Sequence, residues 1–312
     1  MAFDRRAIPA HARESRWLAP DGHAIRRIDW PEIGKDSRGR LLFLPGRGDA
    51  YEKYLETLEH WHRRGWSVTA LDWRGQAGSG RLGADPVTGH VEDFGHWVDD
   101  LAAFWCEWAD GPGPHVLAGH SMGGHLALRA LAEGKVRPAA LVTTAPMLGF
   151  LPPWLSPPVK RVVAGLMCRI GDPRRPAWKW SEKPGEVPQG RARLLTHDAE
   201  RYADELWWRQ ERRELAMGPG SWGWIRAGLA SMAVLARRGA LGAIDVPVLM
   251  LAVSGDALVS APAIARAAAR LPRGELVTFG PEAYHEVLRE TDEVRDKALA
   301  AIDDFLDRAL AP

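Results

Sequence analysis

Residues 119–123 read Gly-His-Ser-Met-Gly and form the pattern G-x-S-x-G around Ser121. An apolar run (115–118) precedes the pattern, and a run of small residues with helical character (124–132) follows it. A serine on a sharp strand-to-helix turn presents its hydroxyl at the top of a parallel sheet, and glycines suit that turn because a Cβ would crowd the neighbouring strand and helix. The pattern therefore predicts that Ser121 is a nucleophile. The alternative is an ordinary glycine-rich turn.

A serine hydroxyl is a poor nucleophile at neutral pH, so it needs a base and an acid that orients the base. These groups gather at the carboxyl ends of parallel strands. Asp256 follows the apolar run 248–253 and fits the orienting carboxylate, whereas Asp245 precedes that run and lies at the wrong edge. The alternative for Asp256 is a turn or helix-capping aspartate. His285 is the only one of 11 histidines beyond Asp256, and the order Ser-Asp-His favours it as the general base.

A developing oxyanion needs two backbone N–H donors. Met122 follows the nucleophile at a helix N-terminus and is the first expected donor. The second is expected from the glycine-rich segment 44–48, through the main chain of Arg47; plain turn formation is the alternative for the glycines there. His120 is expected to pack beside the nucleophile and to contact substrate, and His125 is expected to be structural.

Composition narrows the remaining classes of function. The chain has 312 residues, 46% hydrophobic and 26% charged, with a net charge of +1, which argues against a nucleic-acid partner. No metal-ligand spacing, P-loop or dinucleotide fingerprint occurs, so neither a metal nor another cofactor is expected. Cys106 and Cys168 lie in apolar helical runs and are expected to be buried free thiols in a reducing compartment. The charged segment 1–16 does not resemble a signal peptide, and no apolar run is long enough to span a membrane, so we expect a cytoplasmic protein.

Strand and helix patterns alternate along most of the chain, which predicts an α/β fold with a mostly parallel central sheet flanked by helices. The alternation stops between residues 147 and 240, where no clear strand pattern occurs. We therefore expect a core domain formed by residues 1–146 and 241–312, interrupted by a helical insertion, residues 147–240. The expected strands are 15–19, 23–30, 41–44, 66–71, 115–119, 139–145, 246–253 and 275–279, and the expected helices of the core are 51–64, 94–109, 124–132, 261–271 and 291–310.

On the basis of these residues, the chain resembles the α/β-hydrolase superfamily. Within it, the chain resembles the monoacylglycerol lipase and bacterial lysophospholipase group, which is also classed with serine aminopeptidases. The resemblance covers roughly residues 15–310. Two departures are Pro45, where many relatives have histidine, and Ala77, where glycine is usual. The matching segments are 44–49 with Tyr54, 71–76 with Ser79, 93–104, 119–123, Asp256 and His285.

The resemblance implies an α/β-hydrolase fold whose insertion forms a cap over the site, and hydrolysis of carboxylic esters through an acyl-enzyme on Ser121. The insertion carries a net charge of +7 and the rest of the chain −6, which favours anionic interfaces or phosphate-bearing substrates. We therefore expect a lysophospholipid or monoacylglycerol with one fatty chain as substrate. Trp207, Trp208, Trp222 and Trp224 are expected to form an acyl-binding wall or an interfacial rim, with packing as the alternative.

Apolar residues of the insertion recur at helical spacing and predict an apolar stripe on one helix. Either this helix packs on the core, or the stripe contacts lipid, in which case the protein lies peripherally on the inner face of the membrane. The sequence does not indicate an oligomeric state. The stripe comprises Val159, Val162, Val163, Leu166, Met167 and Ile170.

Two other classes of function stay open at this point. One is a different hydrolase on the same fold, either a small-ester carboxylesterase or an aminopeptidase. An aminopeptidase needs an acidic group for the substrate ammonium, which the basic insertion disfavours but Asp198, Asp204 and Glu205 leave open. The other is a non-catalytic binding protein, which the complete set of serine, histidine and aspartate disfavours.

Overall fold

The computed structural model describes residues 3–32, 37–150, 152, 155–180 and 190–311. These residues contain one eight-stranded sheet in the order β1-β2-β4-β3-β5-β6-β7-β8. Each run that the sequence predicts as a strand is a strand of this sheet. The strands are β1 (Arg13–Leu18), β2 (Ala24–Asp29), β3 (Gly39–Leu44), β4 (Trp66–Leu71), β5 (His115–His120), β6 (Ala140–Thr144), β7 (Val248–Val253) and β8 (Gly274–Phe279).

The sheet is parallel except at one edge. Strands β1 and β2 form an antiparallel hairpin and β2 pairs antiparallel with β4, whereas the six strands from β4 to β8 run parallel. Strands β4, β6 and β7 are buried along their whole length, as parallel strands covered on both faces must be. Because the six strands from β4 to β8 run parallel, their carboxyl ends lie at one edge of the sheet.

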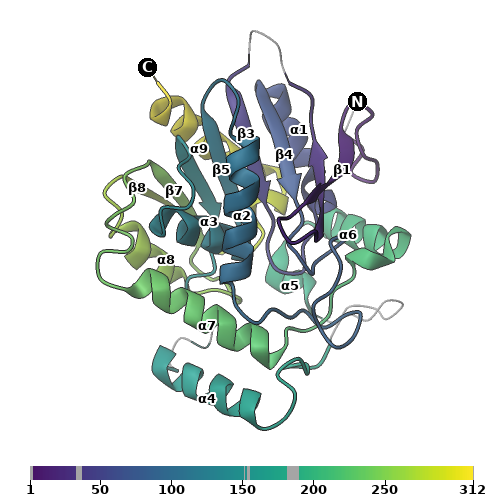
Figure 1. Ribbon diagram of the computed structural model, residues 1–312. Coiled ribbons are helices and arrows are strands. Elements are labelled where there is room, and N and C mark those ends of the chain that lie inside the picture. The colour runs from purple at the N-terminus through teal and green to yellow at the C-terminus, as the bar shows by residue number, and fades with distance from the viewer. Residues whose placement is uncertain (1–2, 33–36, 151, 153–154, 181–189, 312) are drawn as a thin grey trace.

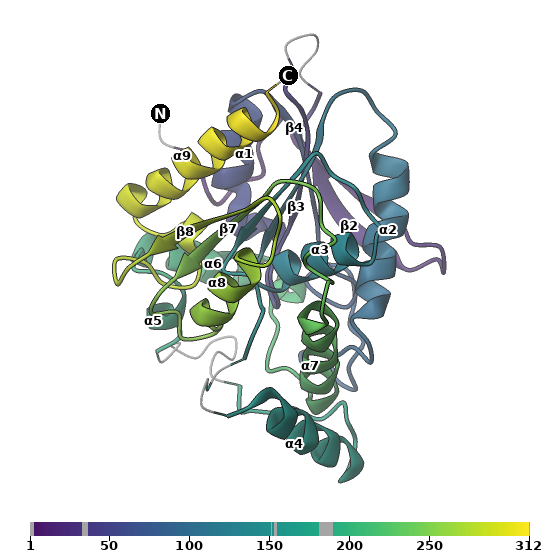
Figure 2. The ribbon, with the colours of Figure 1, turned by 90° about the vertical axis from the view of Figure 1, so that its left-hand side faces the viewer.

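Helices cover both faces of the sheet (Figures 1 and 2). One hydrophobic core joins α1 (Leu55–Arg63) and α9 (Asp292–Ala309) to the sheet. A second core joins α2 (Gly95–Trp108), α3 (Met122–Ala132) and α8 (Ala261–Ala268) to the opposite face. Short 3-10 helices, η1 (Tyr51–Tyr54) and η3 (Val287–Arg289), precede α1 and α9. The expected α/β fold, a mostly parallel central sheet flanked by helices, is confirmed.

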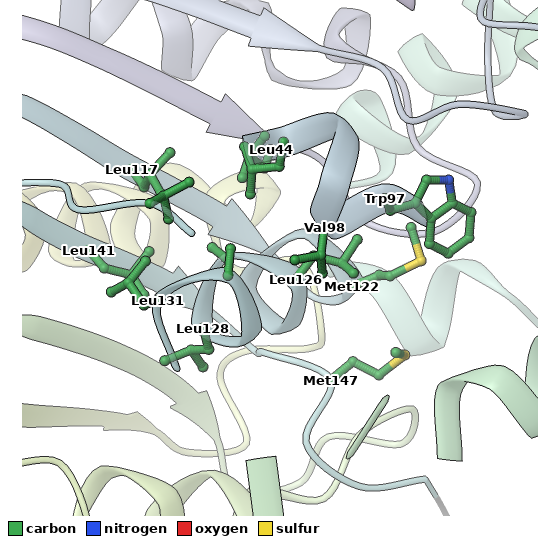
Figure 3. Close-up of a cluster of buried hydrophobic side chains, with 14 of the residues drawn as sticks. Leu44, Trp97, Val98, Leu117, Met122, Leu126, Leu128, Leu131, Leu141 and Met147 are labelled. Carbon is green, nitrogen blue, oxygen red and sulfur yellow. The ribbon is translucent and has the colours of Figure 1, made fainter. Parts of the chain in front are cut away.

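The helix that follows Ser121 is fixed by its packing. Leu126 and Leu128 of α3 are fully buried, and they share the second core with Leu117 of β5 and Leu141 of β6 (Figure 3). Shortening such a buried leucine to alanine typically costs about 2–5 kcal/mol. The start of α3 is therefore held firmly against the sheet.

One expectation about the cysteines is wrong. Cys106 is exposed, and Cys168 is partly buried. On α2 the large residues Leu101, Trp105 and Trp108 face the core, and the helical period turns Cys106 to the outer side.

The segment between β6 and β7 contains α4 (Pro157–Arg169), α5 (Ala192–Leu195), α6 (Ala199–Glu211), η2 (Arg213–Leu215) and α7 (Trp222–Ala236). Among its described residues no strand occurs, as expected for a helical insertion. The division into a core domain and a cap remains a prediction.

Helix α4 lies beyond α7, at the outer end of the molecule in both ribbon views (Figures 1 and 2). It packs on α7, and its one fully buried residue is Ala164. The apolar stripe faces outward, with Val162, Leu166 and Ile170 exposed by 70%, 54% and 63%. These three stripe residues therefore do not pack on the core, which was one of the two alternatives that the sequence left open.

Candidate active site

Ser121 occupies the sharp turn between β5 and α3, with φ 50° and ψ −113°. Such a conformation strains a residue that has a Cβ, typically by about 1–3 kcal/mol. A Cβ on Gly119 would lie 2.7 Å from the backbone of α3, and one on Gly123 would lie 2.2 Å from the carbonyl oxygen of Leu44. The predicted need for glycine at both positions is confirmed, and the turn presents the serine at the carboxyl edge of the sheet.

Three predicted residues meet at this edge. Ser121 follows β5, Asp256 follows β7 and His285 follows β8. The distance from His285 Nε2 to Ser121 Oγ is 3.0 Å, and from His285 Nδ1 to Asp256 Oδ2 it is 2.7 Å. Asp256 Oδ1 accepts hydrogen bonds from the amides of Leu258 and Val259, at 2.7 and 3.0 Å. This geometry can move a proton from the hydroxyl to Nε2 while the carboxylate holds the other ring proton on Nδ1.

Asp245, the alternative to Asp256 as the orienting carboxylate, does not contact His285. The side chain of Asp245 is 68% exposed and pairs with Arg137 at 2.7 Å. Asp256, in contrast, is buried. Burial alone would raise the pKa of Asp256, but His285 and the two amide donors outweigh burial and hold the pKa below its ordinary value. Asp256 is therefore ionised at neutral pH beside the imidazole.

His120 packs beside His285, the expected general base. Its ring lies edge-on to His285, with ring centres 4.8 Å apart, and its Nδ1 is 3.0 Å from Thr144 Oγ1. Burial, with a smaller repulsion from His285, lowers the pKa of His120 to about 4, although Asp49 and Glu286 oppose the shift. A neutral His120 adds no positive charge next to His285. His125 is fully buried, with Nε2 2.6 Å from Ser231 Oγ, which fits its expected structural place.

The loop after β3 uses the amides on either side of Arg47. Gly46 donates to Asp49 Oδ2 at 3.0 Å, and Gly48 donates to Gln76 Oε1 at 2.7 Å. The amide of Arg47, between them, has no acceptor among the described residues. Its neighbours are thus committed to the loop, while its own N–H stays available.

Met122 is the first residue of α3, and a helix gives its first amides no internal acceptor. The helix N-terminus also favours negative charge. The two predicted oxyanion donors, Arg47 and Met122, thus keep their amides uncommitted, and their part in catalysis stays a prediction.

A buried cluster of charged side chains surrounds Glu286, the residue that follows His285. Lys53 Nζ lies 2.5 Å from Asp49, 2.6 Å from Glu286 and 3.1 Å from Glu205. Arg289 pairs with Glu205 at 2.8 Å and with Glu286. The cluster joins the loop after β3, the loop that carries His285 and helix α6. Each of these five side chains is at most 4% exposed.

One group in the described part of the chain has ligand atoms close enough for a metal ion. Asp49, His120 and Glu286 each place one such atom within 4.8 Å of the others. The ammonium of Lys53 already bridges the two carboxylates. The cluster thus carries its own cation, and the donor set fits an ion-pair cluster better than a metal site.

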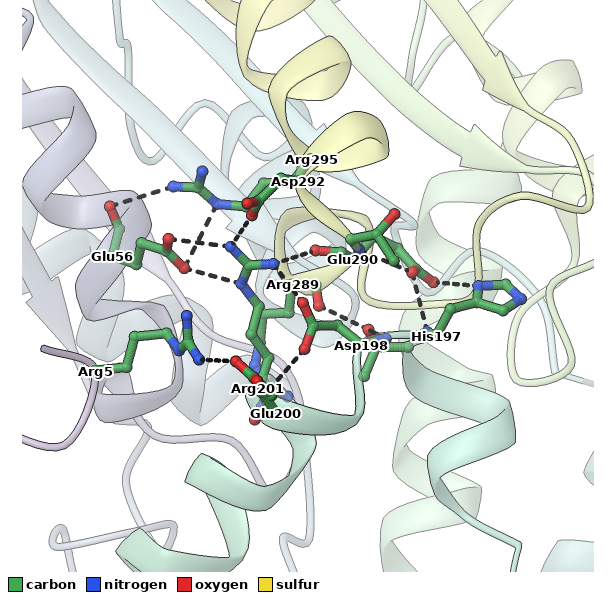
Figure 4. Close-up of polar contacts among 12 residues, drawn as sticks. Arg5, Glu56, His197, Asp198, Glu200, Arg201, Arg289, Glu290, Asp292 and Arg295 are labelled. Atoms are coloured by element: carbon green, nitrogen blue, oxygen red, sulfur yellow. Dashed lines mark hydrogen bonds and ion pairs between the residues drawn. The ribbon is translucent and has the colours of Figure 1, made fainter. Parts of the chain in front are cut away.

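Charged side chains fasten the insertion to the core (Figure 4). Arg201 of α6 pairs with Glu56 at 2.9 Å and with Asp292 at 2.6 Å, and it donates to the carbonyl of Glu290 at 2.7 Å. On the same helix, Asp204 accepts from Arg5. Part of the opposite charge of the two segments is therefore used between them and is not available to a partner.

A cavity of about 740 Å³ opens at Ser121 and His285. Predicted contact residues His120, Trp222 and Trp224 line it, and most of the other lining side chains are apolar, from the insertion and from the loops after β6 and β7. Among them are Met147, Phe150, Leu194, Leu229 and Leu258. This space can hold one long apolar chain beside the serine.

Trp207 and Trp208 lie outside this cavity, so the expectation that they contact substrate is not supported. Trp208 is buried, and its indole N–H donates to the carbonyl of Arg5 at 2.9 Å. Trp207 packs edge-on against it and lies near Arg6. This face of α6 covers the N-terminal segment, which the sequence pattern does not reveal.

Three further residues of the site were not predicted. Trp178 and Lys160 line the cavity, and Lys53 holds the buried charge cluster. For Lys53 the sequence carries one local signal, the spacing of four residues between Asp49 and Lys53; its contacts with Glu205 and Glu286 join segments more than 100 residues apart. Of the helices in the described part of the chain, none is long and apolar enough to cross a membrane.

The comparison with protein families agrees with this geometry. A family described as "Serine aminopeptidase, S33" matches residues 35–292. Lysophospholipase L2 of Escherichia coli (strain K12) is 34% identical over 295 residues, which cover 87% of this chain and 81% of that protein. The probable lysophospholipase L2 of Haemophilus influenzae is 26% identical and covers 91% of this chain and 88% of its own.

Solved structures share the fold. A soluble variant of monoglyceride lipase from Saccharomyces cerevisiae, in complex with a substrate analog, has a TM-score of 0.76 at 19% identity and covers 98% of this chain and 97% of its own. The monoacylglycerol lipase of Paleococcus ferrophilus has a TM-score of 0.67 at 20% identity, covering 91% and 98%. The chain therefore belongs to the serine aminopeptidase S33 family of the α/β-hydrolases.

Proposed function

We propose that this chain is a serine hydrolase that cleaves the carboxylic ester of single-chain lipids, as a lysophospholipase or monoacylglycerol lipase. The observation that carries the proposal is the pair of short contacts of His285, 3.0 Å to Ser121 Oγ and 2.7 Å to Asp256. The relatives named lysophospholipase L2 support the choice of substrate.

The chemistry follows from the contacts of each group. Ser121 Oγ attacks the ester carbonyl as His285 Nε2 takes its proton, and Asp256 stabilises the imidazolium. The amides of Arg47 and Met122 donate to the oxyanion, and losing one such donor typically costs about 100–1,000-fold in rate. His285 then protonates the leaving alcohol, and a water molecule that His285 deprotonates hydrolyses the acyl-enzyme.

The cavity supports a substrate with one long acyl chain. Apolar side chains from α7 and from the loops after β6 and β7 surround the space beside Ser121. We place the insertion, residues 147–240, as a cap over this space, since Trp222 and Trp224 of α7 and Ala164 of α4 line it. Burying an acyl chain there contributes roughly 0.8 kcal/mol per CH₂ group.

The charges of the cavity do not favour the aminopeptidase alternative. Its two lining carboxylates, Asp49 and Glu286, are already bound to Lys53. Of the acids that the sequence left open, Glu205 pairs with Arg289, and Asp204 pairs with Arg5. A substrate ammonium would therefore find no uncompensated acid among these residues.

The test combines active-site labelling with a substrate panel. A fluorophosphonate probe should label the wild type and not Ser121→Ala, and the variant should keep the wild-type circular dichroism spectrum. The wild type should hydrolyse oleoyl lysophospholipid or monooleoylglycerol, and on p-nitrophenyl esters kcat/KM should rise with chain length. Labelling of Ser121→Ala would refute the nucleophile, and exclusive turnover of acetyl and butyryl esters would refute the lipid substrate.

We further propose that α4 rests on a membrane surface. Its outward stripe exposes Val162, Leu166 and Ile170 next to the cavity that Val163 and Ala164 line. An amphipathic helix of this kind lies in the interface with its apolar face among the lipids. A lipid leaving the bilayer would then reach Ser121 under the same helix.

Vesicle flotation tests this contact. A Val162→Glu, Leu166→Glu double variant should bind phosphatidylglycerol-containing vesicles at least about 10-fold more weakly, because each lost apolar contact is worth roughly 1.5–3 kcal/mol. Leu18→Glu is the matched control, since Leu18 is 64% exposed but lies on β1. Unchanged flotation of the double variant, or an equal loss in the control, would count against α4.

A further inference from the structure

The charged residues that line the cavity are unequally compensated. Asp49 and Glu286 are both bound to Lys53, within 2.6 Å. Two of the lining cations, Arg47 and Lys160, have no carboxylate within 4 Å among the described residues. The cavity therefore holds positive charge that the described part of the protein does not balance.

Arg47 carries donors that are not used. Its Nη2 donates to the carbonyl of Gly218 at 2.8 Å. Its Nε is buried without a hydrogen-bond partner. Its Nη1 has no hydrogen-bond partner among the described residues, and the residue as a whole is only partly buried. The N–H groups of a guanidinium are good donors to the oxygens of a carboxylate or a phosphate.

Two tryptophans hold this guanidinium in place. Arg47 Cζ lies 5.2 Å from the ring centre of Trp178 and 5.1 Å from that of Trp224. Stacking on ring faces leaves the N–H edge of a guanidinium directed elsewhere. Burial lowers the pKa of Arg47 to about 9, with added repulsion from Arg191, and Asp49 opposes the shift only in part. At neutral pH the group remains a cation, and an incoming anion would offset its lost hydration.

Lys160 is the second cation of the cavity that could bind an anionic group of a substrate. Its ammonium donates to the carbonyl of Phe150, and burial lowers its pKa. A lysine is a point charge with flexible reach, whereas the fixed arginine fork matches the geometry of phosphate oxygens. The geometry thus favours Arg47.

We propose that the side chain of Arg47 receives the phosphate of a lysophospholipid headgroup and thereby selects phosphate-bearing single-chain lipids over neutral monoacylglycerols. This inference rests on the proposed function, because it assigns the headgroup end of the same cavity. The main-chain amide of Arg47 and its side chain would then serve two parts of one substrate, the ester oxyanion and the phosphate.

The experiment compares two lipids with the same oleoyl chain, lysophosphatidylcholine and monooleoylglycerol, in mixed micelles of one neutral detergent. Lysophosphatidylcholine has no net charge, so attraction to the surface does not contribute. The measured quantity is the ratio of the two kcat/KM values. Arg47→Gln should lower this ratio by about 10- to 100-fold, the usual range for one charge-assisted hydrogen-bonded contact. Damage to the loop affects both substrates alike and cancels in the ratio.

Lys160→Gln tests the competing cation of the cavity, and its ratio should fall less than that of Arg47→Gln, by less than about threefold. An unchanged ratio in Arg47→Gln, or a fall confined to Lys160→Gln, would overturn the assignment to Arg47. If the wild type hydrolyses neither lipid, the proposed function itself fails. The two failures are thus distinguishable.

A measurement on the wild type covers the case in which Arg47→Gln does not fold. Glycerophosphocholine should inhibit hydrolysis of monooleoylglycerol competitively, whereas glycerol at the same concentration should not. Inhibition that is also retained in Lys160→Gln supports the phosphate site at Arg47. Equal effects of glycerophosphocholine and glycerol would refute it.

Discussion

Replacing Lys53 by methionine would remove the cation at the centre of the buried charge cluster. Methionine keeps the unbranched shape of the lysine stem, so the change removes the ammonium with little change in packing. Three carboxylates lie within 3.1 Å of this ammonium: those of Asp49, Glu205 and Glu286. Arg289 would remain as a partner of the two glutamates, but the contact with Asp49 would be lost.

The expected loss of stability is large. Removing one partner of a buried ion pair typically costs about 3–5 kcal/mol, because the remaining charges stay buried without compensation. A domain is commonly stable by only about 5–15 kcal/mol. The free energy of unfolding, measured by urea denaturation with tryptophan fluorescence at pH 7.5, should therefore fall by about 3–5 kcal/mol in Lys53→Met.

Lys297→Met provides the matched control. Lys297 pairs with Glu293 at 2.8 Å, four residues away on α9, and both side chains are more than 60% exposed. Exposed pairs of this kind contribute roughly 0–1 kcal/mol. The control should thus lose less than about 1 kcal/mol. Equal losses in the two variants would refute the argument that the Lys53 cluster is a coupled, buried unit.

The pH dependence of the free energy of unfolding is a second test of the Lys53 cluster, and the direction of the effect can be worked out. Burial alone would raise the pKa values of Asp49 and Glu286, but Lys53 outweighs it and holds both below their ordinary values, that of Asp49 at about 2. Their contribution to stability is therefore present above the ordinary carboxylate pKa of about 4 and is lost as the pH falls toward 2. Without Lys53 both pKa values should rise. The stability gap between wild type and Lys53→Met should therefore be widest above about pH 5 and narrow below about pH 4; a gap that widens in acid would contradict this.

Three further changes test the site and the fold. Asp256→Asn should lower kcat by about 10⁴-fold through the wrong imidazole tautomer, whereas the exposed Asp245→Asn should not; the reverse result in a steady-state assay would show that the wrong carboxylate was chosen. Gly123→Ala should lower soluble yield or melting temperature sharply, because its Cβ would lie 2.2 Å from a backbone oxygen; a wild-type melting temperature would be inconsistent with this packing. In the native protein a thiol reagent such as DTNB should modify Cys106 faster than Cys168, since Cys106 is exposed, and peptide mapping would reveal the opposite order.

The sequence predicts the sheet well because its information is local. Buried parallel strands read as short apolar runs that end at turn residues, and all eight runs are strands. The same logic finds Ser121, Asp256 and His285, because each lies at or shortly after the carboxyl end of a strand. Once the strands are parallel, their carboxyl ends must share one edge of the sheet, so the three side chains meet without any further assumption.

The insertion was harder to predict because its contacts are not local. Helical spacing identifies an apolar stripe on α4, but it does not say which face a neighbouring helix covers. In the structure Ala164 faces inward and Val162 faces solvent. The tryptophans divide in a similar way: Trp224 lines the cavity, whereas Trp208 packs over the N-terminal segment. The position of α6 on the core decides where Trp208 lies, and α6 is held by residues far away in the sequence.

The ion pairs of the structure change the interpretation of the opposite net charges of the insertion and the rest of the chain. The first interpretation was attraction to anionic partners. Arg201 and Arg212 of the insertion, however, pair with Glu56 and Glu52 of the core, and Arg289 of the core pairs back with an acid of α6. These pairs link the two segments, and the groups that form them are satisfied where they stand.

Because those groups are already paired, the positive charge that can recognise a substrate is not the total of +7 but the cations left without a carboxylate at the cavity. Arg47 belongs to the core, so it contributes nothing to the charge of the insertion, yet its guanidinium lies between Trp178 and Trp224 of the insertion. We therefore expect substrate preference to depend on the contacts of single side chains rather than on the net charge of a segment. For that reason the comparison of Arg47→Gln with Lys160→Gln is more decisive than any change of overall charge.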